Sequence, residues 1–299
     1  MRNILSWLIL TPIYLFSLFP LRVHYFFSDI ISWLLREILK YRASTIHINL
    51  ARSFPKLKYE EINSIAKEYY KYMSDIICET IWGLTRTIKH IEKKGLFKVE
   101  NPEILNKAVN LHKGVIIMLG HTGNWEMIYG ITSYSKGEAN FKQEQCIFAY
   151  HKMSSKIAES IFKRLRLTHV TKAESVMPSN KIIRFVIKHK WEDRLYIFNS
   201  DQSPESSAKF AGNFLNQPTF WVTGGEAIAK KMEMPVVYLY IDRKSRGKYI
   251  IRYTSICEDG SKEKDDFILK EYARLLEKDI STNKVNWLWS HKRWKHKFE

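Results

Sequence analysis

Residues 115–126 of this 299-residue chain read VIIMLGHTGNWE, and they give the clearest indication of the fold class. Its first five residues form an unbroken apolar run between Gly114 and Gly120, a pattern typical of a buried strand in a parallel sheet. Similar short apolar runs follow at residues 195–198 and 236–241. The sequence therefore predicts a sheet with these buried strands at its centre.

Helical patterns lie before and between these strands, with apolar residues at helical spacing and typical start or stop residues at several ends. The predicted helices cover residues 59–82, 101–109, 181–190 and 223–233. The last strand is expected to turn back through residues 242–247 into a further strand at 249–253. Alternating strands and helices predict an α/β fold, with a mostly parallel central sheet flanked by helices.

The composition suits a globular protein with an anionic partner. The 45% hydrophobic content is enough for a sizeable core, and this excludes wholesale disorder. Lys and Arg exceed Asp and Glu by 48 to 31, which gives a net charge of +17. Cys78, Cys146 and Cys257 are far apart in the sequence, which excludes a disulfide scaffold and a thiolate zinc site.

The first 40 residues predict attachment to a membrane. Residues 3–21 contain no charge, and as a helix they would extend about 28 Å, close to the hydrocarbon thickness of a bilayer. Pro12 and Pro20 favour a kinked or oblique helix, and a signal peptide is the alternative, although no small-residue cleavage site follows. Residues 25–40 are amphipathic and are expected to lie along the interface.

This pattern divides the chain at residue 40. Residues 1–40 are predicted to be a membrane anchor with an interfacial helix, and residues 41–299 a single catalytic domain. Because Lys- and Arg-rich flanks stay on the cytoplasmic side of a membrane, the basic domain is expected there.

The residues just after the first strand carry candidate chemistry. His121 is followed five positions later by Glu126, which suits a general base and an orienting carboxylate. Chance alone produces this spacing, and the chain repeats it at His24/Asp29 and His169/Glu174. Only His121 stands at the carboxyl end of a predicted strand, where parallel α/β proteins bind ligands. Asn124 is also placed to cap the next helix.

The HTGNWE segment resembles the HX4(D/E) motif of membrane acyltransferases, and its ending is similar to the lauroyl and myristoyl transferases of lipid A biosynthesis. Further segments in the same order resemble that family. They are Tyr41-Arg42, Asn49-Leu50, Ser53-Phe54-Pro55, Asp201-Gln202, Asn213-Phe214-Leu215-Asn216, residues 226–235 (EAIAKKMEMP) and residues 287–297 (WLWSHKRWKHK).

The resemblance implies a function and a fold. The fold would be that of glycerolipid acyltransferases, and the activity would be transfer of a fatty acyl chain from acyl carrier protein to a hydroxyl of a lipid A precursor bearing Kdo. His121 would take the hydroxyl proton with Glu126 as its partner, and neither a cofactor nor a metal is implied. Acyl carrier protein is acidic and the acceptor carries phosphates and carboxylates, so the net positive charge suits both. The inner membrane of the cell is the expected location, with the catalytic domain on its cytoplasmic side.

Residues near the motif are expected to bind the substrates. The family usually has Tyr-Arg-Pro or Tyr-Lys-Pro after its next strand, whereas this chain has Tyr150-His151-Lys152. Two alternatives to substrate binding stay open: Lys152 could be a solvated surface residue, and Asp201 could form a turn that shapes its loop. Electrostatic capture is also expected to involve Arg166. The predicted substrate-binding residues are Asn124, Tyr150, Lys152, Arg164, Asp201, Gln202 and Arg293.

Other functions explain less of the sequence. A glycerolipid acyltransferase would share the HX4D core, but no Phe-Pro-Glu-Gly-Thr-like motif occurs. An acceptor such as an aminolipid or lysophospholipid, or a non-catalytic role at a basic membrane surface, remains an alternative. The Trp-rich basic tail could bind nucleic acid, yet an interfacial belt explains it better, so no nucleic-acid partner is expected. A serine hydrolase is disfavoured because no Gly-x-Ser-x-Gly occurs.

Overall fold

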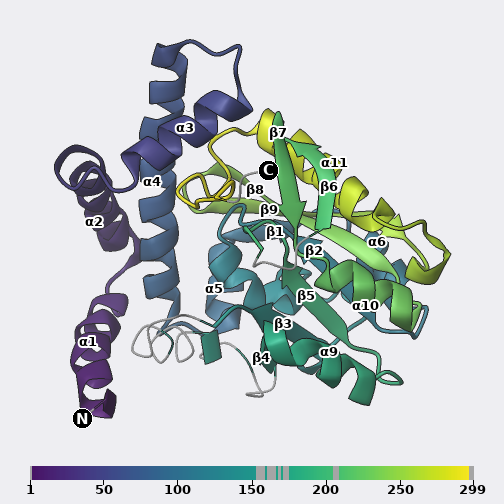
Figure 1. Ribbon diagram of the computed structural model, residues 1–299. Coiled ribbons are helices and arrows are strands. Elements are labelled where there is room, and N and C mark those ends of the chain that lie inside the picture. Colours follow the sequence, from purple (N-terminus) through teal and green to yellow (C-terminus); the bar gives the residue numbers. More distant parts are fainter. Residues whose placement is uncertain are drawn as a thin grey trace.

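The structure is a computed structural model, which describes residues 2–152, 159, 166, 167, 170, 175–204 and 209–295. Within these residues a seven-stranded sheet forms the centre of the molecule (Figure 1). Its strands are β1 (Phe97–Val99), β2 (Val115–Leu119), β3 (Cys146–Tyr150), β4 (Val176–Pro178), β5 (Leu195–Asn199), β8 (Val236–Ser245) and β9 (Lys248–Cys257).

The sheet is mostly parallel, as the sequence predicts. The strand order is β1–β9–β8–β2–β5–β3–β4, and the strands from β8 to β4 run parallel to one another. The predicted hairpin is present, because β9 returns antiparallel to β8 and carries β1 at its edge. A separate antiparallel pair is formed by β6 (Lys209–Phe214) and β7 (Gln217–Trp221), which the sequence does not predict.

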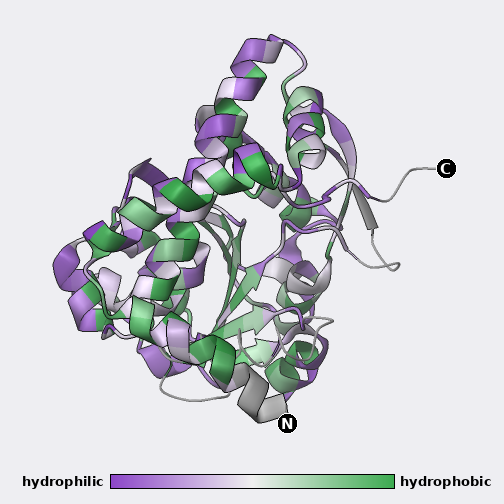
Figure 2. Ribbon diagram, turned by 90° about the vertical axis from the view of Figure 1, so that its left-hand side faces the viewer, coloured by the Kyte–Doolittle hydropathy of each residue, from purple (hydrophilic) through white to green (hydrophobic). Residues whose placement is uncertain are grey.

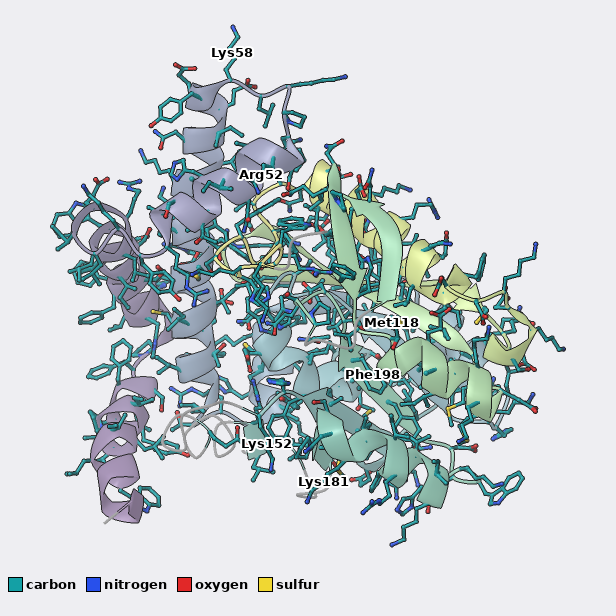
Figure 3. The ribbon with its side chains drawn as sticks, viewed as in Figure 1. Arg52, Lys58, Met118, Lys152, Lys181 and Phe198 are labelled. Atoms are coloured by element: carbon teal, nitrogen blue, oxygen red, sulfur yellow. The ribbon has the colours of Figure 1, made fainter. Side chains whose placement is uncertain are left out.

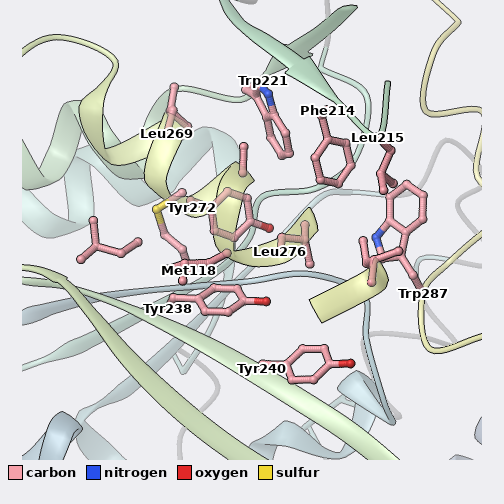
Figure 4. Packing of buried hydrophobic residues seen from close by; sticks show 14 of the residues in the cluster. Met118, Phe214, Leu215, Trp221, Tyr238, Tyr240, Leu269, Tyr272, Leu276 and Trp287 are labelled. Atoms are coloured by element: carbon pink, nitrogen blue, oxygen red, sulfur yellow. The ribbon is translucent and has the colours of Figure 1, made fainter. Parts of the chain in front are cut away.

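Alternating side chains of β2 build two cores, one on each face of the sheet. Ile116 and Met118 pack in the core beneath helices α9 (Ser179–Lys188), α10 (Gly224–Met232) and α11 (Phe267–Thr282). Figure 4 shows Met118 close to Tyr272 and Leu276 of α11. Each fully buried side chain of this size stabilises the fold by roughly 1.5–3 kcal/mol.

The opposite face of the sheet receives Val115, Ile117 and Leu119, which explains why the run is apolar without alternation. Three helices cover this face. They are α5 (Ile88–Lys94), α6 (Pro102–Val109) and α7 (Ile131–Tyr134).

A layer of helices lies along one side of the sheet, at the left of Figure 1. The long helix α4 (Tyr59–Gly83) matches the prediction for residues 59–82 and carries the others. These are α1 (Arg2–Ser17), α2 (Leu21–Trp33), a π-helical turn (Leu34–Ile38) and α3 (Ala43–Ser53). The predicted boundary at residue 40 falls between the π-helical turn and α3.

The uncharged N-terminal stretch is not one straight helix. It divides into α1 and α2, which bend apart at Pro20, where proline breaks the helical hydrogen-bond pattern. In the part of the chain that the structure describes, no helix combines the length and the apolar character that crossing a membrane requires.

Both N-terminal helices leave apolar side chains in solvent. More than half of the large apolar residues that are exposed in the described structure lie between residues 7 and 41. They include Trp7, Phe26, Ile30 and Trp33. Figure 2 looks onto this side of the molecule and shows hydrophobic bands along its front helices.

Candidate functional site

The candidate site forms where β2 and β5 end side by side. The two strands are paired with Leu119 opposite Asn199, so His121 and Asp201 each stand two residues beyond the same level of the sheet. The Nδ1 atom of His121 lies 2.5 Å from Oδ1 of Asp201, and the backbone N–H of His121 donates to Oδ2 at 2.8 Å. The strand register therefore creates a His–Asp pair.

Asp201 is buried and ionised. The indole Nε1–H of Trp287 also donates to its Oδ2, at 2.7 Å. Burial by itself would raise the pKa of this carboxyl, but the positive charge and hydrogen bonds of His121, with that of Trp287, outweigh it and hold the pKa at about 2. The side chain therefore stays negative at any physiological pH.

The other imidazole nitrogen faces a pocket of about 150 Å³. Because Nδ1 contacts a carboxylate, it carries the proton, and Nε2 is the basic atom. The amide nitrogens of Gln202 and Asn199 lie 3.1 and 3.3 Å from Nε2. The pocket is lined by His121, Trp125, Glu126, Ile128, Tyr129, Phe148, Ala149, Tyr150, His151, Arg166, Ile197, Asn199 and Gln202.

Glu126 lies in this pocket with a different partner from the one predicted. Its Oε1 accepts from Nη2 of Arg166 at 3.5 Å, and among the described residues no hydrogen bond joins it to His121. The chain turns into a short 3₁₀-helix at residues 125–130, and the imidazole is held from the neighbouring strand by Asp201. The carboxylate that orients His121 in this structure is therefore Asp201, and a catalytic role for Glu126 stays a prediction.

Asn124 does not line the pocket, and its contacts instead hold the HTGNWE segment in place. Its side chain is fully buried and donates through Nδ2 to Oε2 of Glu79 at 2.9 Å, and it makes no capping hydrogen bond to the next helix. Glu79, on α4, also accepts from the hydroxyls of Tyr25 and Tyr249. This network fixes the HTGNWE segment to α2, α4 and β9, so the substrate-binding and capping predictions for Asn124 are not what its contacts show.

The predicted substrate-binding residues that follow β3 do not gather in one place. Tyr150 lines the pocket and donates to Glu159 at 2.8 Å, and the guanidinium of Arg166 lies over its ring. Lys152 is exposed at the edge of the molecule (Figure 3). Arg164 lies outside the described residues.

Arg293 is buried, which does not suit its predicted role in binding substrate. Only 2% of it is exposed, its Nη2 donates to the carbonyl of Phe220 at 2.6 Å, and its guanidinium lies over the ring of Trp221. Burial lowers the pKa of this guanidinium to about 10. Arg293 therefore joins the C-terminal residues to the β6–β7 pair, and it cannot capture substrate from solution.

The segment 286–293, called here the C-terminal segment, holds the site together. Asn286 accepts the backbone N–H of Gly123 at 3.0 Å, and Nε2 of His291 accepts the backbone N–H of Ser203 at 3.0 Å. With the bond from Trp287 to Asp201, both loops of the site are fixed by this segment. In the sequence only its resemblance to the family points to this segment, because its partners in the two loops lie 86 to 163 positions earlier in the chain.

Gly123 lets the segment after β2 pass close to β8. Its φ is +55°, a left-handed conformation that favours glycine, and a Cβ there would stand 2.2 Å from the side chain of Ile241. Its backbone also accepts a hydrogen bond from the hydroxyl of Tyr72. The glycine in HTGNWE is therefore required by both backbone conformation and space.

The other candidate metal-binding and nucleophilic groups in the described structure show no sign of a second reactive site. No group of three or more His, Cys, Asp or Glu side chains is arranged there to hold a metal ion. Burial raises the pKa of Cys78 and Cys146 to about 12 and that of Cys257 to about 11, which suppresses the nucleophilic thiolate. Of the two other histidines with the predicted spacing, His24 is buried against Phe16 and His169 lies outside the described residues.

Comparison with known proteins identifies the family. A search of curated proteins found no match. The family described as bacterial lipid A biosynthesis acyltransferase matches residues 1–296, which is nearly the whole chain, and His121, Asp201 and the C-terminal segment all lie within the match. The chain therefore belongs to the bacterial lipid A biosynthesis acyltransferase family, and it is an acyltransferase.

Proposed function

We propose that this acyltransferase moves a fatty acyl chain from acyl carrier protein to a hydroxyl of a Kdo-bearing lipid A precursor, with His121 as the general base. The observation that carries the proposal is the basic Nε2 of His121, which faces the pocket while Asp201 holds Nδ1. The family match supports the class of reaction.

In the proposed reaction His121 Nε2 accepts the proton of the acceptor hydroxyl as its oxygen attacks the donor thioester. The C–O bond forms, a tetrahedral intermediate collapses, and the C–S bond breaks. The leaving thiolate takes the proton back from the imidazolium, which restores the base. Asp201 stabilises the imidazolium between these steps, because its low pKa keeps it negative throughout.

Glu126 and Arg166 are assigned to substrate binding in this proposal. They form a charged pair in the wall of the pocket, where Arg166 is mostly buried beside Tyr150 and Glu126. Such a pair would position polar groups of the acceptor or the thioester. The alternative is the prediction from the sequence, in which Glu126 and not Asp201 orients the imidazole of His121.

The proposed location is the inner membrane, with the catalytic domain on the cytoplasmic side where the carrier protein is found. The exposed apolar side chains of α1 and α2 support attachment at the membrane surface. The net charge of +17 supports association with an acidic donor and an acidic acceptor.

The assignment is tested with His121→Ala, Asp201→Asn and Glu126→Gln, assayed with acyl carrier protein thioester and lipid A precursor. We expect His121→Ala to lower kcat about 100- to 10,000-fold. Asp201→Asn should also lower kcat strongly with little change in KM, whereas Glu126→Gln should mainly raise KM.

The chain supplies a matched control. His112 Nδ1 lies 2.6 Å from Oδ2 of Asp193 in a His–Asp pair outside the pocket, with the His112 side chain 73% exposed. His112→Asn and Asp193→Asn should leave turnover unchanged. Near wild-type kcat in folded His121→Ala would defeat the mechanism. A kcat loss in His121→Ala and Glu126→Gln, but not in Asp201→Asn, would instead favour Glu126 as the partner of the imidazole. Lipid mass spectrometry of cells with and without the protein distinguishes the lipid A precursor from an aminolipid or lysophospholipid acceptor.

A further inference from the structure

Helix α9 and the turn after it, in which Trp191 lies, carry an exposed apolar ridge that the fold does not use. Ile183, Ile187 and Trp191 follow one another at intervals of four residues, and they are 50%, 43% and 87% exposed. The adjacent side of the helix is the one that packs, because Ile182 and Val186 are buried in the core. Two isoleucines and a tryptophan that are exposed to solvent along one helix and its following turn indicate a surface for a partner.

Positive charges lie along the exposed side of this ridge and at its end. Lys181, Arg184, Lys188 and Lys190 are all exposed, and residues 179–191 contain no Asp or Glu. Among the described residues none of the four forms an ion pair, although Lys190 lies over the ring of Trp191 at 4.4 Å. The next acid in the sequence, Glu192, is paired with His189 and Arg194 and not with these four cations, which suit a partner with an acidic surface.

The ridge begins beside the catalytic pocket. β3 and β4 are paired with Tyr150 opposite Pro178, and α9 starts at the next residue, so its first turn lies at the same edge of the sheet as His121. Figure 3 shows Lys152 and Lys181 at this edge. From there a ten-residue helix extends about 15 Å along the side of the molecule.

The ridge also lies away from the N-terminal helices. In Figure 1, α4 and the sheet separate α9 from α1 and α2. A membrane held by the apolar side chains of α1 and α2 would leave α9 free for a partner from solution.

We propose that the ridge on α9 (Ile183, Ile187 and Trp191 with the four flanking cations) is the docking surface for the acidic acyl carrier protein. This inference rests on the donor named in the proposed function. A carrier protein seated there would present its thioester arm to the pocket mouth at Tyr150. The four exposed cations predict fast, salt-sensitive binding, because exposed charges act over a screening length of about 8 Å at physiological ionic strength.

The test compares two donors that differ only in the protein part: acyl carrier protein thioester and the same acyl chain on pantetheine. Arg184→Glu combined with Lys188→Glu should raise KM for the protein donor about tenfold at low ionic strength, with kcat unchanged. KM for acyl-pantetheine should not change. Trp191→Ala should have the same selective effect independently of charge.

The matched control reverses two charges at the same spacing on α5, which covers the other face of the sheet. Lys89 and Lys93 are both exposed, so Lys89→Glu with Lys93→Glu should leave both donors unaffected. Calorimetric titration with the carrier protein supplies a readout that needs no turnover.

The outcomes separate the inference from the proposed function. An unchanged KM for the protein donor in the α9 variants, or an equal loss with both donors, overturns the docking surface. Loss of binding to anionic vesicles, with donor KM unchanged, would assign the ridge to a lipid surface and also overturn it. A wild-type protein that transfers no acyl chain contradicts the proposed function, and the calorimetric titration then decides the docking surface alone.

Discussion

In His121, Nδ1 contacts the buried carboxylate of Asp201 and Nε2 faces the pocket. The sequence identifies this histidine from its place at the end of an apolar run. It does not identify Asp201 as the partner, because that pairing depends on which strand lies next to β2. Sequence spacing favours Glu126, five residues away, whereas the register of the sheet favours a residue 80 positions away.

A residue-scale prediction concerns Gly123. We expect Gly123→Ala to destabilise the protein by about 1–3 kcal/mol and to lower kcat, because the new Cβ meets Ile241 and strains a left-handed backbone. The measurement is urea unfolding together with turnover.

The control for this prediction is Gly137→Ala. Gly137 has φ of +85° but nothing lies within 4 Å of its Cβ position, so only the strain applies there. Equal effects of the two substitutions would contradict the claim that close packing against β8 matters at Gly123.

At the scale of elements, prediction succeeds where a segment carries its own periodic signal. The strands β2, β5 and β8 and helices α4, α6, α9 and α10 follow from local patterns. The strands β1 and β4 have only three residues each, too few for a pattern. The β6–β7 pair and the contacts of the C-terminal segment depend on residues distant in sequence, so local reasoning does not find them.

The C-terminal segment gives a prediction for pH. Burial lowers the pKa of His291 to about 4, below its ordinary value of 6.5, with the charges of His121, Arg293 and Arg42 adding to this and that of Asp201 opposing it. The unfolded chain therefore binds a proton between pH 6.5 and 4 that the folded protein rejects. The contribution of His291 to the free energy of unfolding is therefore fully present above pH 6.5. It decreases as the pH falls from 6.5 to 4, by at most about 3 kcal/mol.

This is measured by urea unfolding between pH 7 and pH 4. His291→Gln keeps an acceptor for the N–H of Ser203 and removes the titrating group, so its stability should decrease less with acid. Parallel curves for the two proteins would exclude His291 as the source. Asp201 contributes little to this loss, because its stabilisation is lost mainly between its ordinary pKa of 3.8 and its folded pKa of about 2, below the measured range.

At the scale of the whole molecule, the protein has an apolar side formed by α1 and α2 and a basic ridge on α9. We expect Phe26→Ser, Ile30→Ser and Trp33→Ser together to abolish sedimentation with anionic vesicles. These exposed side chains would insert into the interface, where each buried CH₂ group contributes roughly 0.8 kcal/mol.

The comparison is a triple substitution on the other side of the molecule. Ile183→Ser, Ile187→Ser and Trp191→Ser should leave vesicle binding intact, because α9 is separated from α1 and α2. Full vesicle binding by the α2 variant would show that the N-terminal side is not what holds the protein to lipid.

The site depends on residues 286–293, and this affects when the site can form while the protein is being synthesised. A ribosome makes His121 and Asp201 first, but the indole that binds Asp201 follows 86 residues later. A chain that is still emerging, or one cut by a protease before residue 286, contains the strands without the groups that lock the two loops. Under the proposed mechanism the site is completed only late in synthesis, and a chain that ends before residue 286 is expected to be inactive.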